Sequence, residues 1–180
     1  MPSKVLFITT KDLKQRSIIG GSVDPEKIVQ FIEVAQDTHI QNYLGGKLYK
    51  KIQDIIINNT INDAANSDYK LLLNTYLKPM LIWFSQANFI PFAAFQISNG
   101  GILKHRSENS ESVTTQEMNM LVHKATETAE FYTRRFMDYM DHNSSKYPEY
   151  TQTSNEDMHP DKDVNFGGIY LGWKKGVDIN

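Results

Sequence analysis

The sequence predicts an all-α protein: a four-helix bundle-like core with an extended N-terminal arm, a protruding loop or hairpin and an extended C-terminal tail. Three observations support this class. Apolar residues recur at helical spacing in four segments. Glycine pairs and polar clusters separate those segments. The composition becomes strongly polar after the fourth segment. We therefore expect an arm over residues 1–23, a helical core over 24–142 and a tail over 143–180.

The arm contains a short apolar run over residues 5–8, which is compatible with a strand or an extended segment. The first firm helix is predicted to begin at Asp24, a good N-cap, because Pro25 follows at a position where its missing N–H costs nothing. Its apolar stripe consists of Ile28, Phe31, Ile32, Ala35 and Tyr43. The pair Gly45-Gly46 is predicted to end this helix.

Two more helices are predicted in the middle of the chain. The second spans about residues 47–58 and is followed by an Asn-rich loop. The third begins near Ser67, and Pro79 and Pro91 are expected to kink or end it. Its part over residues 77–97 is apolar on more than one face, so we expect a central core helix or one shared with a neighbouring subunit.

The loop over residues 100–113 is polar and turn-rich, and we expect it to protrude as a loop or hairpin. It carries Lys104 and Arg106, which are candidate partner-binding residues. The fourth helix is predicted over about residues 115–141, with Thr114 or Thr115 as its N-cap. It has the cleanest apolar stripe in the chain, which predicts a long core helix.

The tail is too polar to bury large side chains by itself, yet it contains several aromatic residues. Large aromatics on an extended segment are typical anchors of protein interfaces. The candidate partner-binding residues of the tail are Tyr147, Tyr150, Phe166, Tyr170 and Trp173. The alternative is that these aromatics fold back onto their own domain.

A search for catalytic or metal-binding patterns gives one candidate on the fourth helix. His123, Glu127 and Glu130 have the spacing that places three side chains on one helical face. A ferritin-like di-metal site, however, needs two Glu-x-x-His motifs and two further Glu on facing helices, and the sequence contains no such motif. We therefore expect a solvated polar face there. His39 falls on an apolar stripe and is expected to be a core or interface histidine. The sequence predicts no enzyme, no cofactor and no metal site.

Composition excludes further classes. The formal net charge is −2, whereas a dedicated nucleic-acid binder carries a basic excess. The chain has no cysteine, which is ordinary for a protein that folds in a reducing cytoplasm. The most apolar region, residues 71–97, is interrupted by polar residues and prolines and is not expected to span a membrane. These observations favour a protein-binding function.

The order of several short motifs matches a known family. The motifs are Phe7-Ile8-Thr9, Asp12-Leu13, Val23-Asp24, Ala35-Gln36-Asp37, Ile40, Leu44-Gly45, Leu48-Tyr49, Leu71-Leu72, Tyr76-Leu77-Lys78-Pro79 and Asn99-Gly100-Gly101. With the long last helix, they resemble the small helical head–tail connector, or adaptor, proteins of tailed bacteriophages. The resemblance is nearest to the ring proteins of phages that infect gut Bacteroidetes, including crAss-like phages, and covers roughly residues 5–140.

The resemblance implies a structural virion protein, made in the host cytoplasm, that forms a ring of twelve copies below the portal. Such a ring joins the capsid to the tail, contacts the portal and adjacent tail or ring proteins, and lets DNA pass only as cargo. The chain departs from simple adaptors by continuing beyond the fourth helix, which implies a further contact. Two alternatives remain at this point: a soluble helical regulatory or binding module, and a metal-dependent helical-bundle enzyme.

Overall fold

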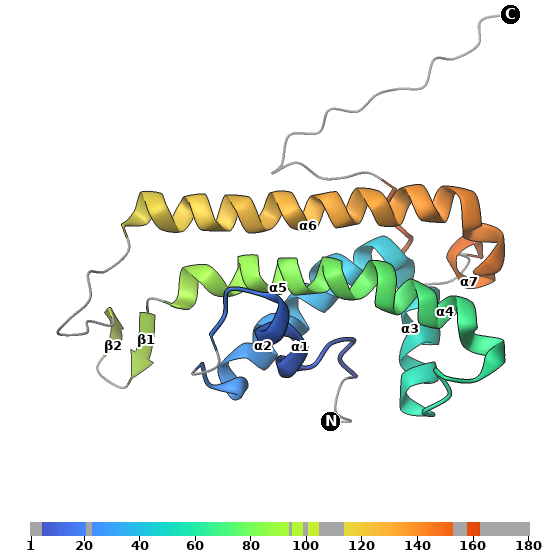
Figure 1. Ribbon diagram of the computed structural model, residues 1–180, viewed down its shortest axis with the longest axis horizontal. Coiled ribbons are helices and arrows are strands. Elements are labelled where there is room, and N and C mark those ends of the chain that lie inside the picture. The colour runs from blue at the N-terminus through green and yellow to red at the C-terminus, as the bar shows by residue number, and fades with distance from the viewer. Residues whose placement is uncertain are drawn as a thin grey trace, which may run out of the picture.

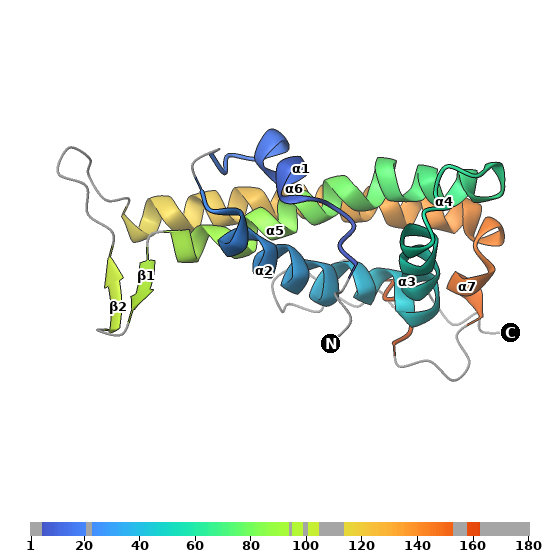
Figure 2. The same cartoon turned by 90° about the horizontal axis from the view of Figure 1, so that it is seen from below.

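The computed structural model confirms the all-α class. It describes residues 5–20, 23–93, 95–98, 101–104, 114–152 and 158–162, with the two short strands described by their backbone. The longest helix, α6 (Thr115–Asn143), runs beside the central helix α5 (Lys78–Ala93), and the N-terminal helices lie on the other side of α5 (Figure 1). A small β-hairpin extends from one end of this arrangement (Figures 1 and 2).

The N-terminal segment is packed onto the core, which corrects the predicted boundary of an extended arm. Its helix α1 (Thr10–Arg16) begins with a capping box, in which Thr9 and Asp12 satisfy each other's backbone N–H groups. The apolar side chains Phe7, Ile8 and Leu13 are buried in the main core. The sequence did not reveal this docking, because the apolar run is short and the core residues that it contacts lie on helices far away in the sequence.

A buried glutamine holds the N-terminal segment in place. The Gln36 Oε1 accepts a hydrogen bond of 2.7 Å from the Phe7 N–H, and the Gln36 Nε2 donates to the Val5 carbonyl at 2.8 Å. The same Nε2 donates to the Tyr49 hydroxyl at 2.9 Å. Gln36 therefore serves two backbone groups that would otherwise lose water on burial, which favours one position of the segment.

The first predicted core helix begins as expected, with Asp24 as N-cap of α2 (Pro25–Ala35). It continues through a π-helical segment, η1 (Gln36–Ile40), into α3 (Gln41–Ile57). Inside α3, Gly45 has φ 72° and ψ 163°, so the helical path bends where the glycine pair predicted a break. The bend turns the following part of α3 away from the axis of α2 (Figure 2).

The third predicted helix has three parts after the turn η2 (Ala64–Asn66): α4 (Ser67–Leu72), the π-helical segment η3 (Leu73–Leu77) and α5. The widened segment η3 ends two residues before Pro79. Proline lacks an N–H and its ring crowds the preceding turn, so a local widening accommodates it within a continuous helix. The second proline, Pro91, lies in the last turn of α5.

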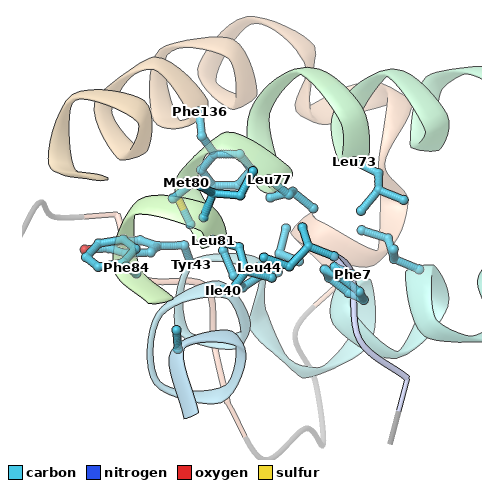
Figure 3. Packing of buried hydrophobic residues seen from close by; sticks show 14 of the residues in the cluster. Phe7, Ile40, Tyr43, Leu44, Leu73, Leu77, Met80, Leu81, Phe84 and Phe136 are labelled. Atoms are coloured by element: carbon cyan, nitrogen blue, oxygen red, sulfur yellow. The ribbon is translucent and has the colours of Figure 1, made fainter. Parts of the chain in front are cut away.

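Helix α5 is covered by the chain itself on most sides, which agrees with the first of the two expectations, a central core helix. Its neighbours are α1, α2, η1 and α6. Figure 3 shows its core side chains, among them Met80, Leu81 and Phe84, packed against residues of η1, α3 and α6. Only near its C-terminal end does a large side chain, Phe92, become exposed.

The loop between α5 and α6 contains the predicted hairpin. Strand β1 (Phe95–Ser98) pairs antiparallel with β2 (Gly101–Lys104), and Ser98 lies opposite Gly101. Helix α6 then begins with a capping box between Thr114 and Glu117, as the sequence predicted for Thr114. Among its most deeply buried side chains are Ala125, Ala129, Phe136 and Met140.

The beginning of the predicted tail belongs to the core, which corrects the boundary at residue 143. Helix α6 ends there, and the turn η4 (Ser144–Lys146) leads into the short helix α7 (Pro148–Thr151), which packs on α3. Residues 158–162 also return to α3. The polar composition concealed this docking, because only a few side chains of the segment carry it.

Candidate functional site

The outer side of α6 presents exposed apolar side chains, although the inner side carries the core stripe. Met120 is 65% exposed and Phe131 is 56% exposed. They are eleven residues apart, close to three helical turns, so they lie on the same side of the helix. We call Met120 and Phe131 the α6 face. Between them lie Lys124 and Glu127, whose charged groups are 3.2 Å apart and offset each other.

A second apolar surface lies where α2 meets the end of α5. Phe31 is half-buried and contacts two rings of α5: Phe89 at a centroid distance of 5.4 Å and Phe92 at 5.3 Å. Phe92 is 57% exposed, and Val34, one turn after Phe31, is 50% exposed. We call Phe31, Val34 and Phe92 the α2–α5 face.

The two faces lie on different sides of the molecule. Helix α5 lies between α6 and α2, so the outer surfaces of α6 and α2 point away from each other (Figures 1 and 2). Exposed aromatic side chains of this size are typical of protein-binding surfaces when they occur in groups. Sequence reasoning missed both faces. Phe131 was detectable, because it falls outside the stripe through Ala125 and Ala129.

Two predicted partner-binding residues of the tail, Tyr147 and Tyr150, are instead buried in the chain's own core. The Tyr147 hydroxyl donates to the Asp68 carbonyl at 3.0 Å and lies 2.9 Å from the Tyr139 hydroxyl. The Tyr147 ring also meets the Tyr69 ring edge-on. The prediction for this pair of residues is wrong, because α4 and α6 form the pocket that a partner was expected to provide.

Tyr69, Tyr139, Tyr147 and Tyr150 form a tyrosine cluster in which burial raises pKa values. Burial is the main cause that raises the pKa of Tyr147 far above its usual value, with the nearby Tyr139 hydroxyl adding to it. Burial likewise raises the pKa of Tyr150 to about 12. At the cluster's edge, the Tyr69 hydroxyl donates to Glu149 at 2.8 Å. The cluster therefore fixes the segment after α6 to the bundle.

The remaining predicted partner-binding residues stay predictions. Phe166, Tyr170, Trp173 and Arg106 lie outside the described residues. Lys104 is the last residue of β2, where the structure describes the backbone. Its backbone lies opposite Phe95, at the end of the hairpin away from the turn.

The metal candidate on α6 has the geometry of a surface ion pair. The His123 Nε2 lies 3.2 Å from the Glu127 Oε1, and both side chains are largely exposed. Glu130 points instead toward the bundle and is 9% exposed, and burial raises its pKa. Within the described part of the chain, no group of three or more His, Cys, Asp or Glu residues could hold a metal ion.

His39 lies on the core side of η1, as its position on an apolar stripe predicted. Its ring stacks on Phe84 with centroids 3.7 Å apart and planes within 4° of parallel. Burial lowers the pKa of His39 to about 4, so the ring is neutral at pH 7. A neutral ring in this stack contributes packing between η1 and α5.

These features describe a helical-bundle protein with two exposed apolar faces. Comparison with known families is more specific: the chain belongs to the family described as "Family of unknown function (DUF6712)", whose profile matches residues 40–159. No curated protein and no solved structure matches the chain significantly. Among the described residues, no helix is long and apolar enough to cross a membrane.

Proposed function

We propose that the protein is a head–tail connector of a tailed bacteriophage: a virion protein that forms a ring below the portal and continues the DNA channel to the tail. The observation that carries the proposal is the pair of unlike apolar faces on different sides of one bundle. A ring of identical subunits needs a heterologous contact, in which one surface of a subunit meets a different surface of the next. The α6 face and the α2–α5 face supply two such surfaces.

The resemblance of the sequence to phage adaptors supports the same assignment and names the partners. The ring would hold twelve copies, dock on the portal and meet adjacent tail or ring proteins. The hairpin lies beyond the end of α5, away from the centre of the bundle (Figure 2), where it can reach a neighbouring ring or the channel. The net charge of −2 suits a channel wall along which DNA passes without being held.

Mass measurement of the purified protein, alone and mixed with the portal protein, tests the proposal. We expect a closed oligomer of twelve copies, formed by the protein alone or on the portal. Phe131→Asp and Phe92→Asp each remove one face and should each give monomers. Ile57→Asp is the matched control, because Ile57 is 63% exposed at the end of α3, outside both faces. This variant should assemble like the unmodified protein.

Mixing the two face variants tests the heterologous contact itself. The Phe131→Asp protein keeps its α2–α5 face and the Phe92→Asp protein keeps its α6 face, so one intact contact remains between them. We expect a dimer from the mixture and monomers from each variant alone. A compact monomer that ignores the portal at all concentrations would refute the connector and favour the soluble binding module.

A further inference from the structure

A groove runs along the helical path from α4 through η3 to α5, on the side that faces the N-terminal segment. It consists of two adjoining hollows of about 300 Å³ and about 170 Å³, which share Asn74 and Lys78 in their walls. The larger hollow lies between this path, the N-terminal segment at Phe7 and the end of α3. The smaller hollow lies beside α1, which packs on α5 (Figure 1). From Lys70 to Ile82 the groove follows about 18 Å of helix.

The groove is basic, although the chain as a whole has a formal net charge of −2. Its charged lining residues are three cations, Lys70, Lys78 and Arg16, and one carboxylate, Asp12. The Asp12 Oδ2 already accepts hydrogen bonds of 2.8 Å from both the N–H and the hydroxyl of Thr9. None of the three cations forms an ion pair with another described residue. Their charge is therefore available to an acidic partner.

The larger hollow is also partly apolar, which favours a protein partner over duplex nucleic acid. Leu73 and Phe7 of the main core form part of its wall, together with the half-buried Ile61. A large apolar side chain that enters such a hollow leaves water, which favours binding. A nucleic-acid duplex would satisfy the cations with phosphates but has no apolar group for the hollow, whereas an acidic protein segment supplies both. Asn74, exposed where the hollows meet, can donate to and accept from the backbone of such a segment.

We propose that the groove binds an acidic segment of another protein, which places one large apolar side chain in the larger hollow and carboxylates beside Lys70, Lys78 and Arg16. Lys70 and Lys78 are about 12 Å apart along the helical path, a distance that an extended segment covers in about four residues. The segment should therefore carry carboxylates about four residues apart, with the apolar side chain between them. No residue of the α6 face or the α2–α5 face lines the groove, so a subunit can bind this segment while both faces contact neighbours.

Fluorescence anisotropy with the labelled peptide Ser-Glu-Asp-Leu-Phe-Asp-Glu-Ser and the whole chain tests the proposal. We expect saturable binding that weakens as salt is raised, because screening reduces the attraction between the carboxylates and the cations. Replacement of Leu-Phe by Ser-Ser should weaken binding by about tenfold or more, since the apolar contact is lost. Replacement of the acidic residues by lysine should abolish binding. A thymidine oligonucleotide of similar length is the probe for phosphate, and it should bind about tenfold more weakly than the peptide, or less.

Two variants, each with a matched control, locate the site. Lys70→Glu reverses one charge of the groove and should weaken peptide binding by about tenfold or more. Lys50→Glu makes the same charge change at an exposed position outside the groove and should have little effect. Asn74→Trp should block the groove, and Leu71→Trp, at an exposed position that lines neither hollow, is its control. Circular dichroism checks that each variant is folded.

Three results would each overturn the inference: no saturable binding of the acidic peptide, unchanged binding by either folded groove variant, or equally tight binding of the oligonucleotide. Peptide binding does not require a ring, because every lining residue of the groove belongs to one subunit. Failure of the peptide to bind therefore rejects this site alone, and the mass of the assembly tests the connector separately.

Discussion

Removal of the Tyr147 hydroxyl tests the statement that the segment after α6 belongs to the folded core. Tyr147→Phe keeps the buried ring but leaves the Asp68 carbonyl and the Tyr139 hydroxyl without this partner. Both partner groups are only partly buried, so the loss of these hydrogen bonds should lower the free energy of unfolding by about 0.5–1.5 kcal/mol. Tyr147→Ala, which also empties a fully buried aromatic site, should cost about 3–5 kcal/mol.

Urea unfolding followed by circular dichroism at pH 7 measures both losses. Tyr132→Phe is a suitable control: Tyr132 lies on α6 and is partly exposed, and its hydroxyl has no hydrogen-bond partner in the described part of the chain, so the change should stay within about 0.5 kcal/mol. In the double variant Tyr147→Phe/Tyr139→Phe, the combined loss should be smaller than the sum of the single losses, because both changes remove the same bond. If Tyr147→Ala cost less than about 1 kcal/mol, residues 144–151 would not be part of the core, and the original tail boundary would stand.

Three further predictions concern other parts of the bundle. Gly45→Ala places a side chain on a backbone that favours glycine and pushes it against Pro160, so the free energy of unfolding should fall by about 1–3 kcal/mol or more. Gly46→Ala is the control: Gly46 does not have a positive φ, so this change should be neutral or slightly stabilising. His39 is neutral in the fold, and its folded pKa of about 4 lies below the value of 6.5 in the unfolded chain. Its contribution to the free energy of unfolding is therefore complete above pH 6.5 and is lost as the pH falls toward 4. Urea titrations at pH 7 and pH 4 should show a loss of up to ~3 kcal/mol, which the His39→Gln variant lacks. Thr114→Ala breaks the capping box of α6 and should cost about 0.5–2 kcal/mol in the same assay, with Thr115→Ser, beside the cap, as a near-neutral control.

Local rules predicted the helices well, because the residues that set their limits are neighbours in the sequence. Asp24 with Pro25 and Thr114 with Glu117 begin helices through bonds that span only a few positions. The break at Gly45 also follows from one residue. The π-helical segments η1 and η3 were not predicted, because such short widened turns have no apolar periodicity that distinguishes them from an α-helix.

The docking of residues 5–8, 144–151 and 158–162 could not be predicted from such rules. Gln36 binds backbone groups some 30 positions away, Tyr147 binds the carbonyl of Asp68 in α4, and Asp161 binds Asn42 across more than half of the chain. Each contact involves one or two residues in a polar segment, so composition gives no sign of it. For this reason Tyr147 and Tyr150 were predicted to bind a partner, although the chain itself covers them.

This correction changes the basis of the connector proposal and makes it more specific. From the sequence, the candidate contact surfaces were the apolar segment 77–97 and the aromatic residues of the tail, but most of α5 and both Tyr147 and Tyr150 are buried within one subunit. Among the exposed apolar side chains of the described residues, Met120 and Phe131 lie on one side and Val34 and Phe92 on another, while others such as Ile18, Ile57 and Leu71 lie elsewhere. Because the α6 face and the α2–α5 face consist of different residues, a two-fold contact that joins like to like would leave one of them open to water. Successive contacts between unlike surfaces cover both in every copy, and only closure into a ring ends such a series without an open face.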